Sequence, residues 1–322
     1  MLEPSHESPG DPLRPLHRRR RLAAVAMLPT LLTLGNLIFG FGAIYQCGLE
    51  MRDLGAGVRF QEKRTLNSDF AEARAPSYLS IAVWMLVASA ICDALDGRIA
   101  RLARKSSKFG EQLDSLADVV SFGVAPALMM VTLVRREIEQ WGYAPFGISQ
   151  FGRLTVFVGV IYACCTALRL ARFNVETSLD ESAHRGFKGL PSPGAAGAVV
   201  SVILLHDHLD QREMWPNIAA ILTRAYPFLT LVIALLMVSR VPYTHAVSSL
   251  FRRRPLGHVV IILLILPFLI IYSELTLFLM AWAFILSGPI RLLLRRNQPQ
   301  AVPAGAPPAA PAEEPYPRSS TE

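Results

Sequence analysis

The chain has 322 residues, of which 52% are apolar and 18% charged, and its formal net charge is +7. The apolar residues gather in runs close to the roughly 20 residues that cross the hydrocarbon of a bilayer, which excludes a soluble single-domain protein. The basic residues lie at the ends of these runs, where anionic lipid headgroups attract them, so we do not expect nucleic acid as a partner.

The apolar runs predict an all-α, polytopic membrane helical bundle with about eight transmembrane helices. The expected spans are residues 24–46, 77–99, 117–134, 152–172, 192–206, 217–239, 257–271 and 273–290. The last two are short and could form one re-entrant hairpin. The first follows an arginine-rich stretch, but its apolar run exceeds the roughly 7–15 residues of a secretory signal core, which indicates an anchored helix.

One membrane domain is expected to carry the whole function. It covers residues 22–296, after a basic N-terminal segment of residues 1–21. Residues 297–322 are rich in Ala and Pro without an apolar period, which predicts a disordered tail with no chemistry of its own.

Positive charge predicts the orientation, because Lys and Arg accumulate on the cytoplasmic side of short loops. The N- and C-termini are therefore expected in the cytoplasm, and basic residues recur at every second junction between spans. Three arginines fall on the outer side and break this rule: Arg135, Arg136 and Arg153. His206 and His208 are expected in a solvated outer loop.

Four aspartates in apolar surroundings are the strongest functional signal in the chain. On a helix, Asp93 and Asp96 share one face, and Asp114 and Asp118 share a face of the next helix. A short turn between the two helices would bring the four carboxylates together at the cytoplasmic end of the bundle. Acid at membrane depth is costly and usually serves an ion, a substrate or a proton. All-oxygen ligands suit Mg²⁺ or Mn²⁺, and shared carboxylates could hold two such ions.

Two neighbours of the aspartates favour a phosphate-bearing substrate. Gly97 leaves room for a close approach, and Arg101 offers a planar fork for phosphate oxygens. Without them, a divalent-cation transporter with the aspartates along its path would be a fair alternative, and it stays open as the more distant one.

These residues resemble the signature of the CDP-alcohol phosphatidyltransferase family at all eight fixed positions: Asp93, Asp96, Gly97, Ala100, Arg101, Gly110, Asp114 and Asp118. The resemblance implies a membrane enzyme with a six-helix core, usually a homodimer, that moves a phosphatidyl group from a CDP-linked lipid to an alcohol and releases CMP. It also implies that the four aspartates bind two metal ions, that Asp118 is also the general base, and that Gly97, Arg101 and Ser107 contact the CDP moiety.

Motifs outside the signature resemble those of bacterial integral-membrane phosphatidylserine synthases. They are residues 28–36, 114–126, 169–174 and 189–193. This resemblance implies CDP-diacylglycerol and L-serine as substrates and the bacterial inner membrane as the location. Candidate substrate contacts are Asn36, Arg169, Arg172 and Lys188, the last three because a serine carboxylate needs a cation. A sister enzyme that uses glycerol phosphate, inositol or choline remains the nearer alternative.

Overall fold

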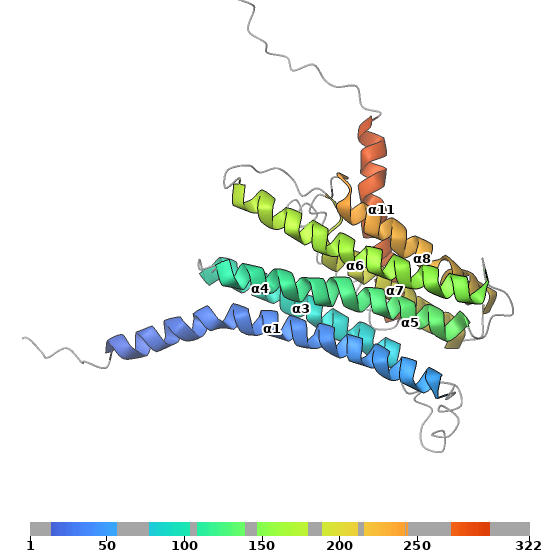
Figure 1. The fold of residues 1–322 in the computed structure, drawn as a ribbon. Coiled ribbons are helices and arrows are strands. Elements are labelled where there is room, and N and C mark those ends of the chain that lie inside the picture. The colour runs from blue at the N-terminus through green and yellow to red at the C-terminus, as the bar shows by residue number, and fades with distance from the viewer. Residues whose placement is uncertain are drawn as a thin grey trace, which may run out of the picture.

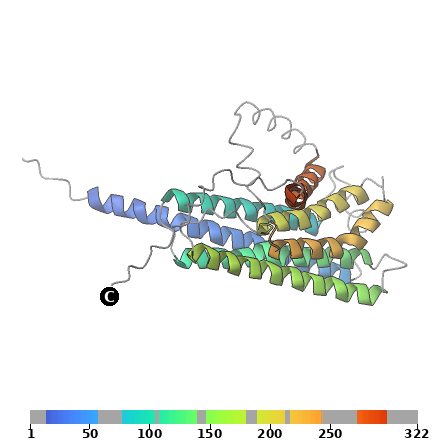
Figure 2. The same ribbon diagram turned by 90° about the horizontal axis from the view of Figure 1, so that it is seen from above.

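A computed structural model describes residues 14–56, 77–103, 108–138, 147–179, 189–211, 216–241, 243 and 272–296, and the regular structure of these residues is entirely helical. The elements are α1 (Arg14–Gly55), α3 (Tyr78–Ala103), α4 (Lys108–Asp118), the π-helical η1 (Val119–Val124), α5 (Ala125–Ile138), α6 (Ile148–Leu179), α7 (Ser192–Gln211), α8 (Pro216–Val238) and α11 (Ser273–Arg296). Helices α1 to α8 run alongside one another, and α11 crosses them steeply (Figure 1). Figure 2, in which α11 is seen nearly end-on, shows the same arrangement from above. The expected all-α bundle is confirmed.

Six described helices are long and apolar enough to cross a membrane. They are Leu28–Gly55, Tyr78–Ile99, Phe109–Ile138, Ser149–Glu176, Asn217–Val238 and Ser273–Leu292. The expected span 192–206 forms α7, which is not in this set, and the expected span 257–271 lies outside the described residues. The span expected to begin at residue 117 starts earlier, because α4 continues directly into η1 and α5. Asp114 and Asp118 therefore belong to this long membrane helix.

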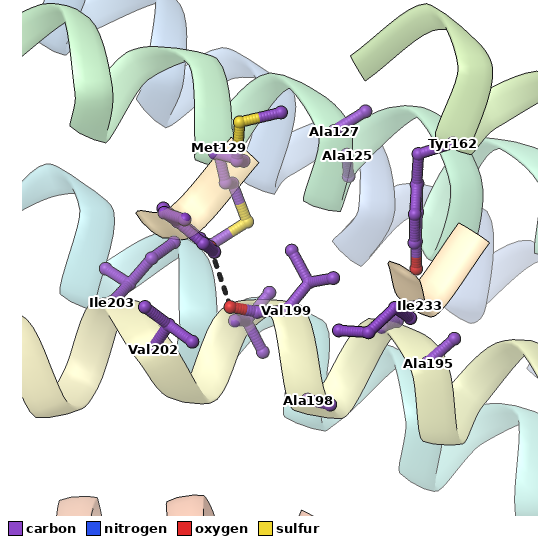
Figure 3. Close-up of a cluster of buried hydrophobic side chains, with 14 of the residues drawn as sticks. Ala125, Ala127, Met129, Tyr162, Ala195, Ala198, Val199, Val202, Ile203 and Ile233 are labelled. Atoms are coloured by element: carbon purple, nitrogen blue, oxygen red, sulfur yellow. Dashed lines mark hydrogen bonds between the residues drawn. The ribbon is translucent and has the colours of Figure 1, made fainter. Parts of the chain in front are cut away.

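The apolar core lies where α5, α6, α7 and α8 meet (Figure 3). Met129, Tyr162, Val199 and Ile233 are at most 1% exposed there. A buried hydroxyl needs a hydrogen-bond partner, and Tyr226 meets this need by donating to the main-chain carbonyl of Val199 at 2.7 Å. The remaining apolar surface is available for lipid.

A proline shapes the middle of the long α4–η1–α5 helix. Pro126 has no N–H to donate to the carbonyl of Phe122, four residues earlier. The hydroxyl of Tyr162 donates to that carbonyl at 3.1 Å, and the N–H of Ala125 reaches back five residues to the carbonyl of Val120. The helix is therefore widened into a π-turn directly after Asp118, and such turns are frequent at functional sites.

A buried polar network, here called the Arg136 cluster, joins α1, α3, α5 and α7. The Arg136 guanidinium lies 2.9 Å from Asp207 Oδ1 and 3.7 Å from Glu50 Oε1. Ser77, immediately before α3, donates to Asp207 Oδ2 at 2.7 Å. His206 is 1% exposed, so the expected solvated loop at this position is wrong: α7 continues through it. The cluster holds four helices together at one end of the bundle.

Candidate functional site

Helix α1 forms one wall of the site, because it packs against α3, α4 and η1. The close approach to η1 depends on Gly40, since a Cβ at this position would overlap the side chain of Ser121. This contact lets Asn36, one turn earlier on α1, reach Asp118 on α4, and Thr33, two turns earlier, reach Asp96 on α3.

Three of the four aspartates converge on one point. Asp93, Asp114 and Asp118 each offer a carboxylate oxygen, and these oxygens lie within 4.8 Å of one another. Asp118 is buried, and Asp93 and Asp114 are half-buried. Within the described part of the chain, the buried Asp114 Oδ1 has no hydrogen-bond partner. Three carboxylates this close repel one another strongly in a poorly solvated site. An all-oxygen set with an unpaired buried acceptor therefore fits a divalent cation of the Mg²⁺ type.

Asp96 lies beside this trio and is not part of it. Its side chain is 4% exposed, and its Oδ2 accepts a hydrogen bond from Thr33 Oγ1 on α1 at 3.1 Å. The structure thus brings all four expected aspartates to one region and gives Asp96 a different environment from the others.

Asn36 holds Asp118 from the α1 side. Its Nδ2 donates to Asp118 Oδ1 at 3.0 Å, and its Oδ1 accepts from Ser89 at 2.5 Å. Its main-chain carbonyl accepts from Ser121 at 3.0 Å. The side chain is fully buried and both of its amide atoms are occupied, an arrangement suited to orienting Asp118.

Sequence reasoning missed Thr33, Ser89 and Ser121 as members of this network. A signal was available: Thr33 and Asn36 are three residues apart in an apolar helix, and Ser89 precedes Asp93 by one helical turn. Polar side chains at these spacings lie on the faces that carry the rest of the site.

Gly97 borders open space next to the aspartates. A Cβ built at this position would meet none of the described atoms within 4 Å, so these residues leave room for a ligand there. The backbone of Arg101 belongs to α3, but its side chain lies outside the described residues. Ser107 and Lys188 also fall outside them.

The two arginines of α6 have different surroundings. Arg169 Nη1 donates to Ser192 Oγ at 2.8 Å, and the guanidinium interacts electrostatically with Asp118. Its Nε is buried and has no hydrogen-bond partner among the described residues. Arg172 instead forms a surface ion pair with Glu176 at 2.8 Å, one turn along the same helix. Of the two, Arg169 is the one that interacts electrostatically with Asp118.

Comparison with known proteins agrees with this geometry. The family model for CDP-alcohol phosphatidyltransferase matches residues 26–235. The chain is 45% identical over 125 residues to a CDP-diacylglycerol–serine O-phosphatidyltransferase of Helicobacter pylori, covering 39% of this chain and 46% of the relative. It is 33% identical over 211 residues to the enzyme of that name in Mycobacterium tuberculosis, covering 64% and 65%. With the Methanocaldococcus jannaschii protein of the same name, the identity is 34% over 168 residues, covering 52% and 65%.

Each of these alignments spans less than two thirds of the relative's own length. The family match itself extends over well over half of the chain, from the first membrane helix to the end of α8, and includes all four aspartates. The protein belongs to the CDP-alcohol phosphatidyltransferase family.

Proposed function

We propose that this protein transfers the phosphatidyl group of CDP-diacylglycerol to the hydroxyl of L-serine, giving phosphatidylserine and CMP. The family supports the reaction class, and the names of the relatives support serine as the acceptor. The observation that carries the proposal is the convergence of Asp93, Asp114 and Asp118, with Asp118 held from α1 by Asn36.

Asp118 is the proposed general base. Its carboxylate takes the proton of the serine hydroxyl, and the serine oxygen forms a bond to the phosphorus that carries diacylglycerol. The bond from this phosphorus to the bridging oxygen breaks, and CMP leaves with that oxygen. The hydrogen bond from Asn36 Nδ2 orients the carboxylate. This lowers the activation barrier of the transfer, because the base is already aligned with the serine hydroxyl in the reacting complex.

The four aspartates would hold two divalent cations, Mg²⁺ or Mn²⁺. When bound, such ions neutralise the charge of the pyrophosphate and stabilise the leaving group. Asp93, Asp114 and Asp118 supply the converging oxygens, and Asp96, which Thr33 holds through one oxygen, supplies a further ligand.

Substrate binding is assigned to residues around the trio. The open space at Gly97 suits the CDP moiety, with Arg101 and Ser107 as its other contacts. For the serine carboxylate we favour Arg169 over Arg172 and Lys188, because its Nε is buried and unpaired close to Asp118. A guanidinium in this state gains a partner when a carboxylate binds.

The protein is an integral membrane protein by the length and composition of its helices. We further propose that it lies in a bacterial inner membrane as a homodimer, with both termini and the aspartates on the cytoplasmic side. The basic residues of the N-terminus support this orientation.

CMP release by purified protein in detergent tests the proposed reaction. CDP-diacylglycerol and Mn²⁺ or Mg²⁺ are supplied with L-serine, glycerol 3-phosphate, inositol or choline in parallel. Release that requires both metal and serine, with a serine-containing lipid as product, supports the proposal. Release with another alcohol keeps the mechanism but overturns serine as acceptor. Metal flux into liposomes without any CDP-lipid, and no CMP release, would favour a transporter.

The variant Asp118→Asn tests whether Asp118 is the general base. It should abolish transfer while part of the metal binding, followed by Mn²⁺ electron paramagnetic resonance, remains. Full transferase activity in this variant would refute the assignment of the base.

A further inference from the structure

Helices α5 and α6 pack tightly in the middle of the bundle and separate toward the Arg136 cluster. A Cβ built on Gly159 of α6 would lie 3.3 Å from Val131 Cγ2 and 3.5 Å from the carbonyl of Ala127 on α5. Two turns away, a Cβ on Gly152 would meet none of the described atoms within 4 Å. The two helices therefore form a wedge that opens toward the end of α5.

This wedge contains a cavity of about 500 Å³, here called the α5–α6 groove. Its apolar walls include Val131, Val134 and Val156. The volume lies within the roughly 300–1,000 Å³ of small-molecule sites, and the groove is lined by residues of two membrane helices. Its walls suit an acyl chain.

Two arginines border the groove, Arg135 on α5 and Arg153 on α6. Both are exposed, and neither forms an ion pair with any residue in the described ranges. Their neighbour Arg136 differs, because it is buried among carboxylates. Two exposed guanidinium groups that line an apolar slot and have no carboxylate partner among the described residues are suited to the oxygens of a phosphate.

The groove is remote from the aspartates. Arg135 follows Asp118 by 17 residues along the continuous α4–η1–α5 helix, which corresponds to about 25 Å at 1.5 Å per residue. This distance approaches the roughly 30 Å thickness of the hydrocarbon core. A ligand of the two arginines would therefore sit at headgroup level in the leaflet opposite the aspartates.

We propose that the α5–α6 groove binds an anionic membrane phospholipid of that opposite leaflet. The headgroup phosphate lies between Arg135 and Arg153, and one acyl chain lies along the valine-lined wall. The site explains why these two arginines depart from the usual distribution of positive charge across the membrane. The proposal does not depend on which reaction the aspartates perform.

Lipid-dependent thermal unfolding of the full chain in neutral detergent tests the proposal. The probes are dioleoyl phosphatidylglycerol, dioleoyl phosphatidylcholine and inorganic phosphate, each titrated separately. Phosphatidylglycerol should raise the unfolding midpoint most, and the double variant Arg135→Ala/Arg153→Ala should weaken its apparent affinity about 30-fold, since each basic residue contributes attraction near the surface. The matched control is Arg52→Ala, an exposed arginine at the same end of the bundle and outside the groove.

A second variant tests the acyl chain separately. Gly152→Phe fills the groove without removing charge, and no neighbouring atom opposes the first carbon of the new side chain. It should weaken phosphatidylglycerol binding while both arginines remain. The proposal is overturned if the double arginine variant binds phosphatidylglycerol like the parent protein, or if Gly152→Phe does. Equal stabilisation by inorganic phosphate, or equal loss in Arg52→Ala, would overturn it as well.

Discussion

Replacing Asn36 with alanine distinguishes a residue that positions Asp118 from one that contacts substrate. The change removes the donor 3.0 Å from Asp118 Oδ1, a hydrogen bond to a charged group that contributes roughly 1.5–3 kcal/mol. If this energy is needed in the transition state, kcat falls about 10- to 150-fold. The loss of stability should be small. The hydroxyl of Ser89, which loses the Asn36 side chain as a partner, can still donate to the main-chain carbonyl of residue 36, 3.2 Å away.

The assay is CMP release at varied L-serine and saturating CDP-diacylglycerol. A positioning role predicts a lower kcat with an unchanged KM for serine, because the bound substrate does not touch Asn36. A substrate contact predicts a raised KM with a smaller effect on kcat. Thermal unfolding of each variant verifies that it is folded.

Two further variants sharpen this test. Asn36→Gln keeps the amide but moves it by one methylene, so it should lose nearly as much activity as the alanine variant. Ser89→Ala removes a neutral partner of Asn36 and should cost only about 2- to 12-fold, from a contribution of roughly 0.5–1.5 kcal/mol. An Asn36→Ala variant with the kcat of the parent protein, or with a change in the KM for serine alone, would refute the positioning role.

Three more predictions concern the fold and use thermal unfolding in detergent. Tyr162→Phe removes the donor to the Phe122 carbonyl and should cost about 1 kcal/mol of stability, whereas no loss would mean that another donor serves that carbonyl. Arg136→Met leaves buried carboxylates uncompensated and should cost roughly 3–5 kcal/mol; an unchanged midpoint would show that the cluster is not stabilising. Gly40→Leu should lower both stability and CMP release, because α1 can no longer approach η1. The control is Gly48→Leu, at a position where a Cβ meets no described atom, and it should change neither quantity. Equal effects of the two variants would contradict the need for close contact between α1 and η1 at Gly40.

The helices and the convergence of the aspartates were predictable from the sequence. The hydrophobic runs are long, and a spacing of three or four residues places paired aspartates on one helical face whatever the rest of the chain does. The structure brings Asp93 of α3 and the two aspartates of α4 together, with carboxylate oxygens within 4.8 Å of one another, while both helices pack mainly against α1.

The partners of the aspartates were not predictable to the same degree. Asn36 and Asp118 are 82 residues apart, and Thr33 and Asp96 are 63 apart, so their hydrogen bonds exist only once the helices have packed. The sequence identified Asn36 as a polar residue in an apolar helix, but it could not say whether the amide would turn to a substrate or to a neighbouring helix.

Hydropathy also misjudged two ends of helices. It placed the start of a span at residue 117 because the preceding turns of α4 are amphipathic, with polar residues that face the site. It placed His206 in a solvated loop, whereas His206 and its neighbour Asp207 lie within the protein, next to Arg136. Average polarity cannot distinguish a solvated charge from one that is neutralised by a partner.

The Arg136 cluster also limits how the helices can move relative to one another. Glu50 lies about 20 Å along α1 from Asn36, so α1, α3, α5 and α7 are fastened at the end remote from the aspartates. Because Asn36 and Thr33 also tie α1 to Asp118 and Asp96 nearer its other end, we expect α1 and the helices that carry the aspartates to move as one unit when a ligand binds.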